Sequence, residues 1–178
     1  MKRAAALLAT FVGLAIVVHV AAILAAPRAI MALAIGKLSQ GGKEANAFHF
    51  SRRTSAQSRD VVRPSPDLAY ASCVYDLSKG PVLVEAAPTP GSGYASISVF
   101  AGNTDNIGVF DTIANPQGVR FVLARAGEAL PDRVTRLQLP VVTSPSAKGV
   151  ILDRRLAPTQ AAFELADKAR RTDRCAPL

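Results

Sequence analysis

A long uncharged run near the N-terminus constrains this chain more than any other feature. Lys2 and Arg3 are followed at residues 4–26 by 23 uncharged positions, interrupted only by His19 and by two small residues, Thr10 and Gly13. A helix rises about 1.5 Å per residue, so a helix of this length crosses a hydrocarbon core of roughly 30 Å. The run therefore predicts a membrane anchor. A cleavable signal peptide is the alternative, but its apolar core is usually shorter, at about 7–15 residues.

The charges on either side of the run bear on its orientation. Lys2 and Arg3 favour an N-terminus that stays in the cytoplasm. Arg28, Lys37 and Lys43, on the far side, argue in the opposite direction. We expect the N-terminus inside and the rest of the chain outside the cytoplasm.

Composition divides the chain into three regions. Residues 1–38 are predicted to form the anchor and a short amphipathic continuation, which ends where Gly41 and Gly42 interrupt the helix. Residues 39–66 are polar, basic and rich in turn-forming residues, and are expected to be a linker. Residues 67–178 are predicted to fold as one domain.

The pattern within that domain is mainly β. Ala69, Ala71, Cys73 and Tyr75 alternate with more polar positions, as expected of a strand with one buried face. Further strands are predicted at residues 82–87, 94–101, 118–125, 134–143 and 149–156, and a short helix at residues 158–174. We expect the first three strands to form an antiparallel meander, and the domain to be an antiparallel β-sandwich or jelly-roll-like fold.

Two cysteines, Cys73 and Cys175, lie far apart in the sequence. In an oxidising compartment they can form a disulfide that closes a loop of roughly 100 residues. The alternative is that Cys73 is a small buried residue and Cys175 a free thiol near the chain end. The sequence leaves both open.

Several function classes find no support. Beyond residue 38 the chain has 17 basic and 13 acidic residues, a net charge of +4, and it contains no tryptophan. We therefore expect no nucleic-acid partner. His49 is the only histidine outside the anchor, and it has no neighbours suited to a catalytic triad or a metal site. We predict no metal, no other cofactor and no catalytic residues, and the chain is not expected to be an enzyme.

Some residues nevertheless suit a small-ligand or glycan site. Tyr70, Tyr75 and Tyr94 are the candidate pocket residues, with Asn103 and Asp105 in a nearby polar turn. The alternatives are tyrosines of the core or the sheet surface, and a turn that uses Asn and Asp for local backbone hydrogen bonds.

Ordered motifs over residues 64–158 resemble the bacterial envelope family of domain of unknown function 1254. They are the Asp-x-x-Tyr pattern at residues 67–70, DLSKGPV at 76–82, the Tyr-x-Ser strand at 94–96, the Asn-Thr turn at 103–106 and VVTSPSAKGVILDRRLAP at 141–158. The resemblance implies a β-sandwich domain of the bacterial envelope, here in the periplasm and anchored in the inner membrane. Larger members continue into a second β-rich domain, domain of unknown function 1214.

The leading hypothesis is therefore a non-catalytic, membrane-anchored domain that acts through a partner, a separate β-rich protein of the cell envelope. A small-ligand or glycan-binding domain is the alternative, and a hydrolase is the least favoured class.

Overall fold

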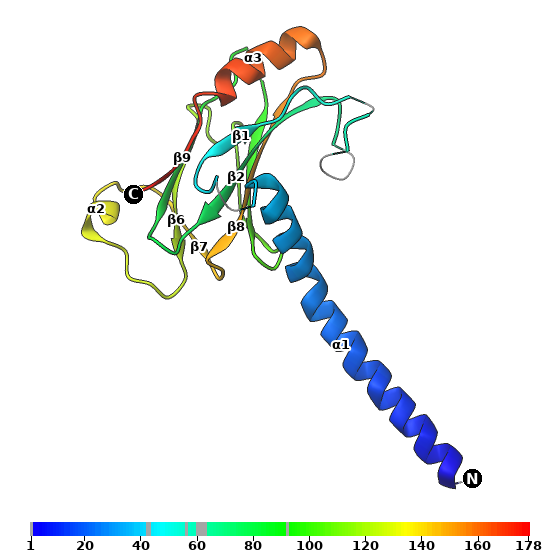
Figure 1. Ribbon diagram of the computed structural model, residues 1–178. Coiled ribbons are helices and arrows are strands. Elements are labelled where there is room, and N and C mark those ends of the chain that lie inside the picture. Colours follow the sequence, from blue (N-terminus) through cyan, green and yellow to red (C-terminus); the bar gives the residue numbers. More distant parts are fainter. Residues whose placement is uncertain (1, 42–43, 56, 60–63, 92) are drawn as a thin grey trace.

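The computed structural model describes residues 2–41, 44–55, 57–59, 64–91 and 93–178. A long N-terminal helix extends away from a domain built of two β-sheets (Figure 1). Within the described residues the elements are α1 (Lys2–Leu38), β1 (Phe48–Phe50), β2 (Leu68–Asp76), β3 (Val82–Ala86), β4 (Ala95–Ala101), β5 (Asn106–Asp111), β6 (Val119–Arg125), α2 (Asp132–Thr135), β7 (Val141–Ser144), β8 (Lys148–Leu156), α3 (Gln160–Arg170) and β9 (Arg174–Pro177).

The domain has the mainly β architecture that the alternation predicted. One sheet has five strands in the order β1-β2-β8-β4-β5, and all of its neighbouring strands are antiparallel. The other has four strands in the order β7-β6-β3-β9, in which β6 and β7 run parallel. The main hydrophobic core lies between the sheets, and Phe110 of β5 stacks on Phe121 of β6 with ring centroids 4.6 Å apart.

The predicted meander is wrong. β2 and β4 lie on either side of β8 in the five-stranded sheet, whereas β3 belongs to the four-stranded sheet. Alternating side chains indicate only that a strand has one buried face. The same alternation occurs in strands that pair within one sheet and in strands that face each other across a core. The three strands of the predicted meander, β2, β3 and β4, therefore cross from the five-stranded sheet to the four-stranded sheet and back.

The structure also differs from the strand predicted at residues 134–143. This region begins with α2 and turns at Gln138, whose φ is 52°, and pairing starts only at Val141. Pro140 has no amide proton to donate to a ladder, which is one reason why the strand is short. The structure adds three short strands that were not predicted, β1, β5 and β9.

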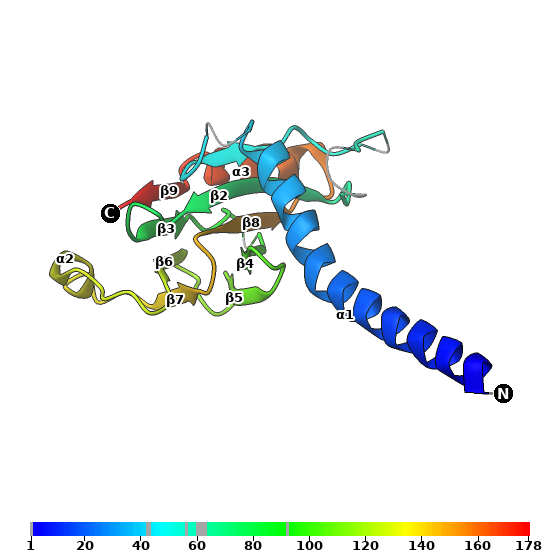
Figure 2. The ribbon, with the colours of Figure 1, turned by 60° about the horizontal axis from the view of Figure 1, so that its bottom comes forward.

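α1 continues through Pro27 without a break as far as Leu38. Its N-terminal two thirds are exposed, and the helix is long and apolar enough to cross a membrane. Its last turns lie beside the five-stranded sheet (Figures 1 and 2). On the outer face of that sheet, Met31 packs on Val74 and Val150. The helix predicted to be an anchor is therefore also packed against the domain.

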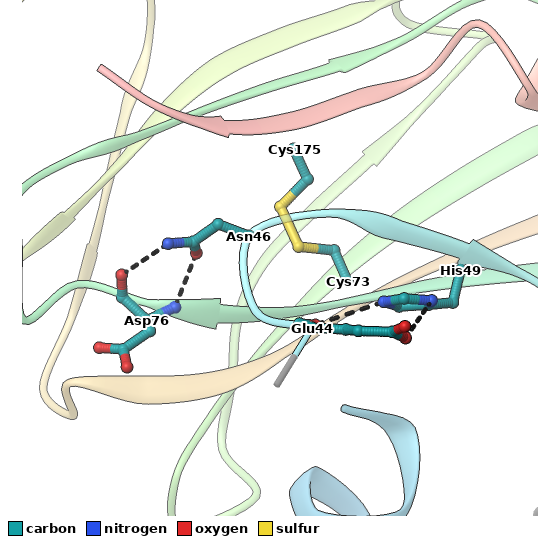
Figure 3. The surroundings of a disulfide bond; sticks show 6 residues. All are labelled: Glu44, Asn46, His49, Cys73, Asp76 and Cys175. Atoms are coloured by element: carbon teal, nitrogen blue, oxygen red, sulfur yellow. Dashed lines mark hydrogen bonds and ion pairs between the residues drawn. A yellow bond between two sulfur atoms is a disulfide. The ribbon is translucent and has the colours of Figure 1, made fainter. Parts of the chain in front are cut away.

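A disulfide joins Cys73 of β2 to Cys175 of β9, with a Cα–Cα distance of 6.5 Å (Figure 3). Both half-cystines are buried, and the bond links the five-stranded sheet to the four-stranded sheet. It also holds β9, the last strand, at the edge of its sheet beside β3.

The segment before β1 is attached to the same part of β2. The Asn46 side chain accepts a hydrogen bond from the Asp76 amide at 2.8 Å and donates one to the Asp76 carbonyl at 3.0 Å (Figure 3). His49 Nδ1 lies 3.2 Å from the Glu44 carboxylate, and its Nε2 lies 3.3 Å from the Glu44 carbonyl oxygen. These contacts set the position of β1, from which the chain continues along the outer face of the sheet.

Candidate functional site

A pocket of about 770 Å³ lies on the outer face of the five-stranded sheet, next to the end of α1. Met31, Ala34 and Leu38 of α1 form one wall. The segment between β1 and β2 forms another, with described residues 51–54, 58 and 64. The floor comes from β2, β8 and one residue of β4. Pockets of roughly 300–1,000 Å³ are the usual size for small-molecule sites.

Strand register explains how the floor is arranged. Val74, Val150 and Phe100 form one row across β2, β8 and β4, and the end of α1 packs on this row. The next row is Ser72, Leu152 and Ser98, and the third is Tyr70, Arg154 and Ser96. Because side chains two residues apart share a face, the floor changes from apolar beside α1 to polar and charged away from it.

Contacts with α3 hold the wall that the segment between β1 and β2 forms. Arg170 is fully buried and donates hydrogen bonds to the carbonyls of Tyr70 and Ser51. Its guanidinium also pairs with Asp167 at 2.5 Å, so its charge is compensated. Arg53, at the rim, donates to Gln160 and to the Pro158 carbonyl. The segment predicted to be a linker is therefore tied to the folded domain at several points.

Arg154 carries the charge on the pocket floor. Its side chain is half-buried, and one Nη donates to Ser98 Oγ at 2.9 Å. Within the described part of the chain, no carboxylate pairs with this guanidinium, and its buried Nε has no hydrogen-bond partner. A charge that is withdrawn from water normally has a counter-charge nearby. The guanidinium of Arg154 could therefore pair with an anion that enters the pocket.

Arg155, the next residue along β8, is paired with carboxylates. Arg155 points to the other side of the sheet, where it is fully buried and pairs with Asp153 and Asp173, each at 2.8 Å. Burial, together with the nearby Asp153 charge, raises the pKa of Asp173 to about 7, although Arg155 opposes the shift. Thr89 accepts a further hydrogen bond from Arg155. The four residues of this cluster are buried, and none of them lines the pocket.

The sequence-predicted ligand residues are dispersed. Tyr70 lines the pocket, and its hydroxyl accepts a hydrogen bond from the Ser65 amide at 2.8 Å. Tyr75 is fully buried in the core, where its hydroxyl bonds with Ser144 and the Phe100 carbonyl, and burial raises its pKa. Tyr94 is partly exposed and does not line the pocket.

Asn103 and Asp105 also lie away from the pocket, in the turn between β4 and β5. They bond with each other at 2.6 Å around Thr104, which has a φ of 71°. This is the local side-chain bonding typical of polar turns. Among the described residues there is no group of three or more His, Cys, Asp or Glu side chains placed to hold a metal ion.

Arg154 was not among the residues predicted to bind a ligand. One signal was available: Arg154 follows Val150 and Leu152 at alternate positions of a predicted strand, so a charge was to be expected on a largely apolar face. The sequence holds no comparable signal for the pocket residues of α1 or for residues 51–54, 58 and 64, because they reach the floor only through tertiary packing.

The fold of this chain is similar to part of a solved structure. A crystal structure of the VPA0106 protein from Vibrio parahaemolyticus matches with a TM-score of 0.65 at 14% identity, over 86% of this chain and 36% of that one. An uncharacterized protein from Burkholderia cenocepacia matches at 17% identity with a TM-score of 0.44, over 70% of this chain and 35% of that one. The present chain thus spans about a third of the length of either protein.

Among curated proteins, none matches the sequence significantly. The model of one family, described as protein of unknown function (DUF1254), matches residues 45–177, which is the whole two-sheet domain with β1 and the segment after it. The chain belongs to this DUF1254 family.

Proposed function

We propose that the protein is a non-catalytic, membrane-anchored binding domain, and that its ligand places an apolar part in the pocket beside α1. The observation that carries this proposal is the pocket of about 770 Å³, which the end of α1 and the outer face of the sheet form together. The described lining offers aliphatic and aromatic side chains, with a few polar groups at one end, as ligand pockets commonly do.

The position of the pocket along α1 favours a ligand that is present near a membrane. If residues 4–26 cross the hydrocarbon core, Met31 lies about 8 Å and Leu38 about 18 Å beyond it along the helix axis. The polar interface of a bilayer is roughly 5–8 Å thick on each side. The pocket would then lie just above the headgroups.

We place the anchor in a bacterial inner membrane, with the N-terminus in the cytoplasm and the two-sheet domain in the periplasm. The Cys73–Cys175 disulfide supports this side of the membrane, because such bonds persist in oxidising compartments. Protease added to intact spheroplasts should digest the domain; protection until the membrane is lysed would contradict this orientation.

The pocket hypothesis is tested by photoaffinity labelling in phosphatidylcholine nanodiscs. Nanodiscs are preferable to micelles because single-chain detergents can themselves occupy an apolar pocket. The probe is the uncharged primary amide of lauric acid with a photoreactive diazirine near the chain end, and peptide mapping identifies the labelled residues. We expect labels on pocket residues of β2 and β8.

A matched pair of variants locates the binding. Ala34→Trp places a bulky ring in the pocket wall and should abolish labelling of β2 and β8. Leu33→Trp makes the same kind of change at a neighbouring, highly exposed position of α1 and should leave the labelling as in the wild type. Equal labelling of the two variants, or labels confined to the exposed part of α1, would contradict the proposed function.

A protein partner is the second candidate, and one surface favours it. β5 and β7 are edge strands of the two sheets and contact each other, and both carry exposed valines, Val109 and Val141. Exposed apolar strands at a sheet edge can accept a strand from another protein. Cross-linking from position 109 in cells should capture a β-rich envelope protein; recovery of the monomer alone would argue against a partner at this edge.

A further inference from the structure

We propose that the pocket binds a single-chain amphiphile with an anionic headgroup, and that Arg154 pairs with that headgroup. This inference rests on the proposed function and adds the chemical class of the ligand and the residue that selects it. Its basis is the combination of an apolar pocket with a half-buried guanidinium that has no counter-charge among the described residues.

The charges around the pocket are of one sign. Three arginines, Arg52, Arg53 and Arg154, line it, and no Asp or Glu does so within the described part of the chain. Arg52 and Arg53 are exposed at the rim, where water screens their charges. Arg154 is the half-buried one, so its interaction with an anion is stronger than that of a surface residue.

The arrangement of the arginines differs between the two faces of β8. Arg155 on the core side pairs with two carboxylates, whereas the partner that Arg154 has among the described residues is the hydroxyl of Ser98. A carboxylate or a phosphate is the group that a guanidinium pairs with best, because both can accept two parallel hydrogen bonds. An anionic ligand would therefore give Arg154 the kind of acceptor that Asp153 and Asp173 give Arg155.

Two hydroxyl groups stand beside the proposed headgroup position. Tyr70 is the direct cross-strand neighbour of Arg154, and because its oxygen accepts from the Ser65 amide, its proton remains available to donate. Ser72, also in the pocket lining, lies one row closer to α1. Both hydroxyls can donate to an anionic oxygen.

The apolar part of the ligand would lie in the opposite direction. From Arg154 the floor continues through Leu152 to Val150 and Phe100, and ends at Met31 of α1. The volume is that of a site for one drug-sized molecule, so we assign it a single chain rather than the two chains of a phospholipid. The chain end would then point towards α1 and the membrane.

The test compares two photoreactive probes on the full-length protein in phosphatidylcholine nanodiscs, the diazirine-bearing lauric acid and its primary amide. In the wild type we expect the acid to half-saturate the labelling of β2 and β8 at a concentration at least about ten-fold lower than the amide does. Arg154→Met should remove this preference while the amide still labels the pocket. Arg154→Lys, which keeps the charge, should retain part of it.

Arg136→Met is the matched control. Arg136 is exposed at the end of α2, on the opposite side of the domain from α1 (Figures 1 and 2), and its loss should leave the preference for the acid unchanged. Thermal unfolding of every variant identifies those that fail to fold. If Arg154→Met fails to fold, the Arg154→Lys variant and the wild-type preference decide the question.

The outcomes separate this inference from the proposed function. If the amide does not label the pocket at all, the proposed function fails. If the amide labels it but the acid has no advantage, or Arg154→Met weakens both probes equally, the role of Arg154 is refuted. Dodecyl phosphate should compete with the acid far better than inorganic phosphate; equal competition would mean a site for free anions and would overturn the assignment to an amphiphile.

Discussion

The disulfide between Cys73 and Cys175 should supply a large part of the stability of the two-sheet domain. Its half-cystines are 102 residues apart in sequence, and it joins the two sheets through β2 and β9. In the chain-entropy model, opening a loop of this length stabilises the unfolded state by about 4.7 kcal/mol at 25 °C. Since domains of this kind are stable by about 5–15 kcal/mol in total, this is between a third and nearly all of the free energy of unfolding.

The perturbation is the double variant Cys73→Ala/Cys175→Ala, which leaves no free thiol. Guanidinium unfolding of the nanodisc-embedded protein, followed by circular dichroism of the β-sheets, should give a free energy of unfolding about 4–5 kcal/mol lower than in the oxidised wild type. The melting temperature should fall by roughly 10–20 °C, because each kcal/mol corresponds to about 2–4 °C in a domain of this size.

Reduction of the wild-type protein provides an independent version of the same measurement. Both sulfurs are buried, so a phosphine reductant should act slowly on the folded protein and quickly once denaturant opens it. The reduced wild type and the double alanine variant should then unfold at similar denaturant concentrations, and the reductant should have no effect on the variant. A loss below about 1 kcal/mol in both experiments would refute the loop-closure reasoning for this domain.

Two further predictions concern the domain interior. The folded-state pKa of Asp173, raised to about 7 by burial, exceeds its unfolded value of about 3.9, so folding retains a proton that the unfolded chain has released. Wild-type stability should therefore fall by a few kcal/mol as the pH rises from about 4 to 7, and Asp173→Asn should flatten this slope in denaturant titrations; an unchanged slope would contradict it. Gly149→Ala should destabilise the protein by several kcal/mol, because a Cβ at this position would collide with the Phe100 carbonyl and the Tyr75 hydroxyl. Thermal unfolding measures the loss of stability, and a variant that melts at the wild-type temperature would refute the predicted collision.

The alternation of side chains in the sequence was sufficient to predict the longer strands but not their partners. β2, β4, β6 and β8 each have a strongly buried face, and all four were predicted close to their observed positions. The assignment of β3 to the other sheet could not be read from its own residues, because Val82 and Val84 would be buried in either arrangement. The edge strands β1, β5 and β9 are short or weakly buried, so the pattern gave little signal for them.

The candidate site was predicted less well than the fold, and Tyr70 and Tyr75 show why. The two tyrosines lie on one strand five residues apart, so alternation places them on opposite faces of the sheet. Only the position of α1 and of the segment after β1 determines which of the two faces has a pocket. Tyr70 faces the pocket and Tyr75 faces the core. The residue type is the same in both cases, so it could not predict which tyrosine lines a pocket.

α1, the candidate membrane span, is also part of the candidate site. Met31, Ala34 and Leu38 belong to the same continuous helix as the apolar run, and they close the end of the floor where an apolar chain would terminate. A change in the angle between α1 and the sheet would therefore change the width of the pocket directly. Met31 is the buried contact of α1 with Val74 and Val150, so if α1 spans a bilayer, this packing would couple the depth of the helix to the shape of the site.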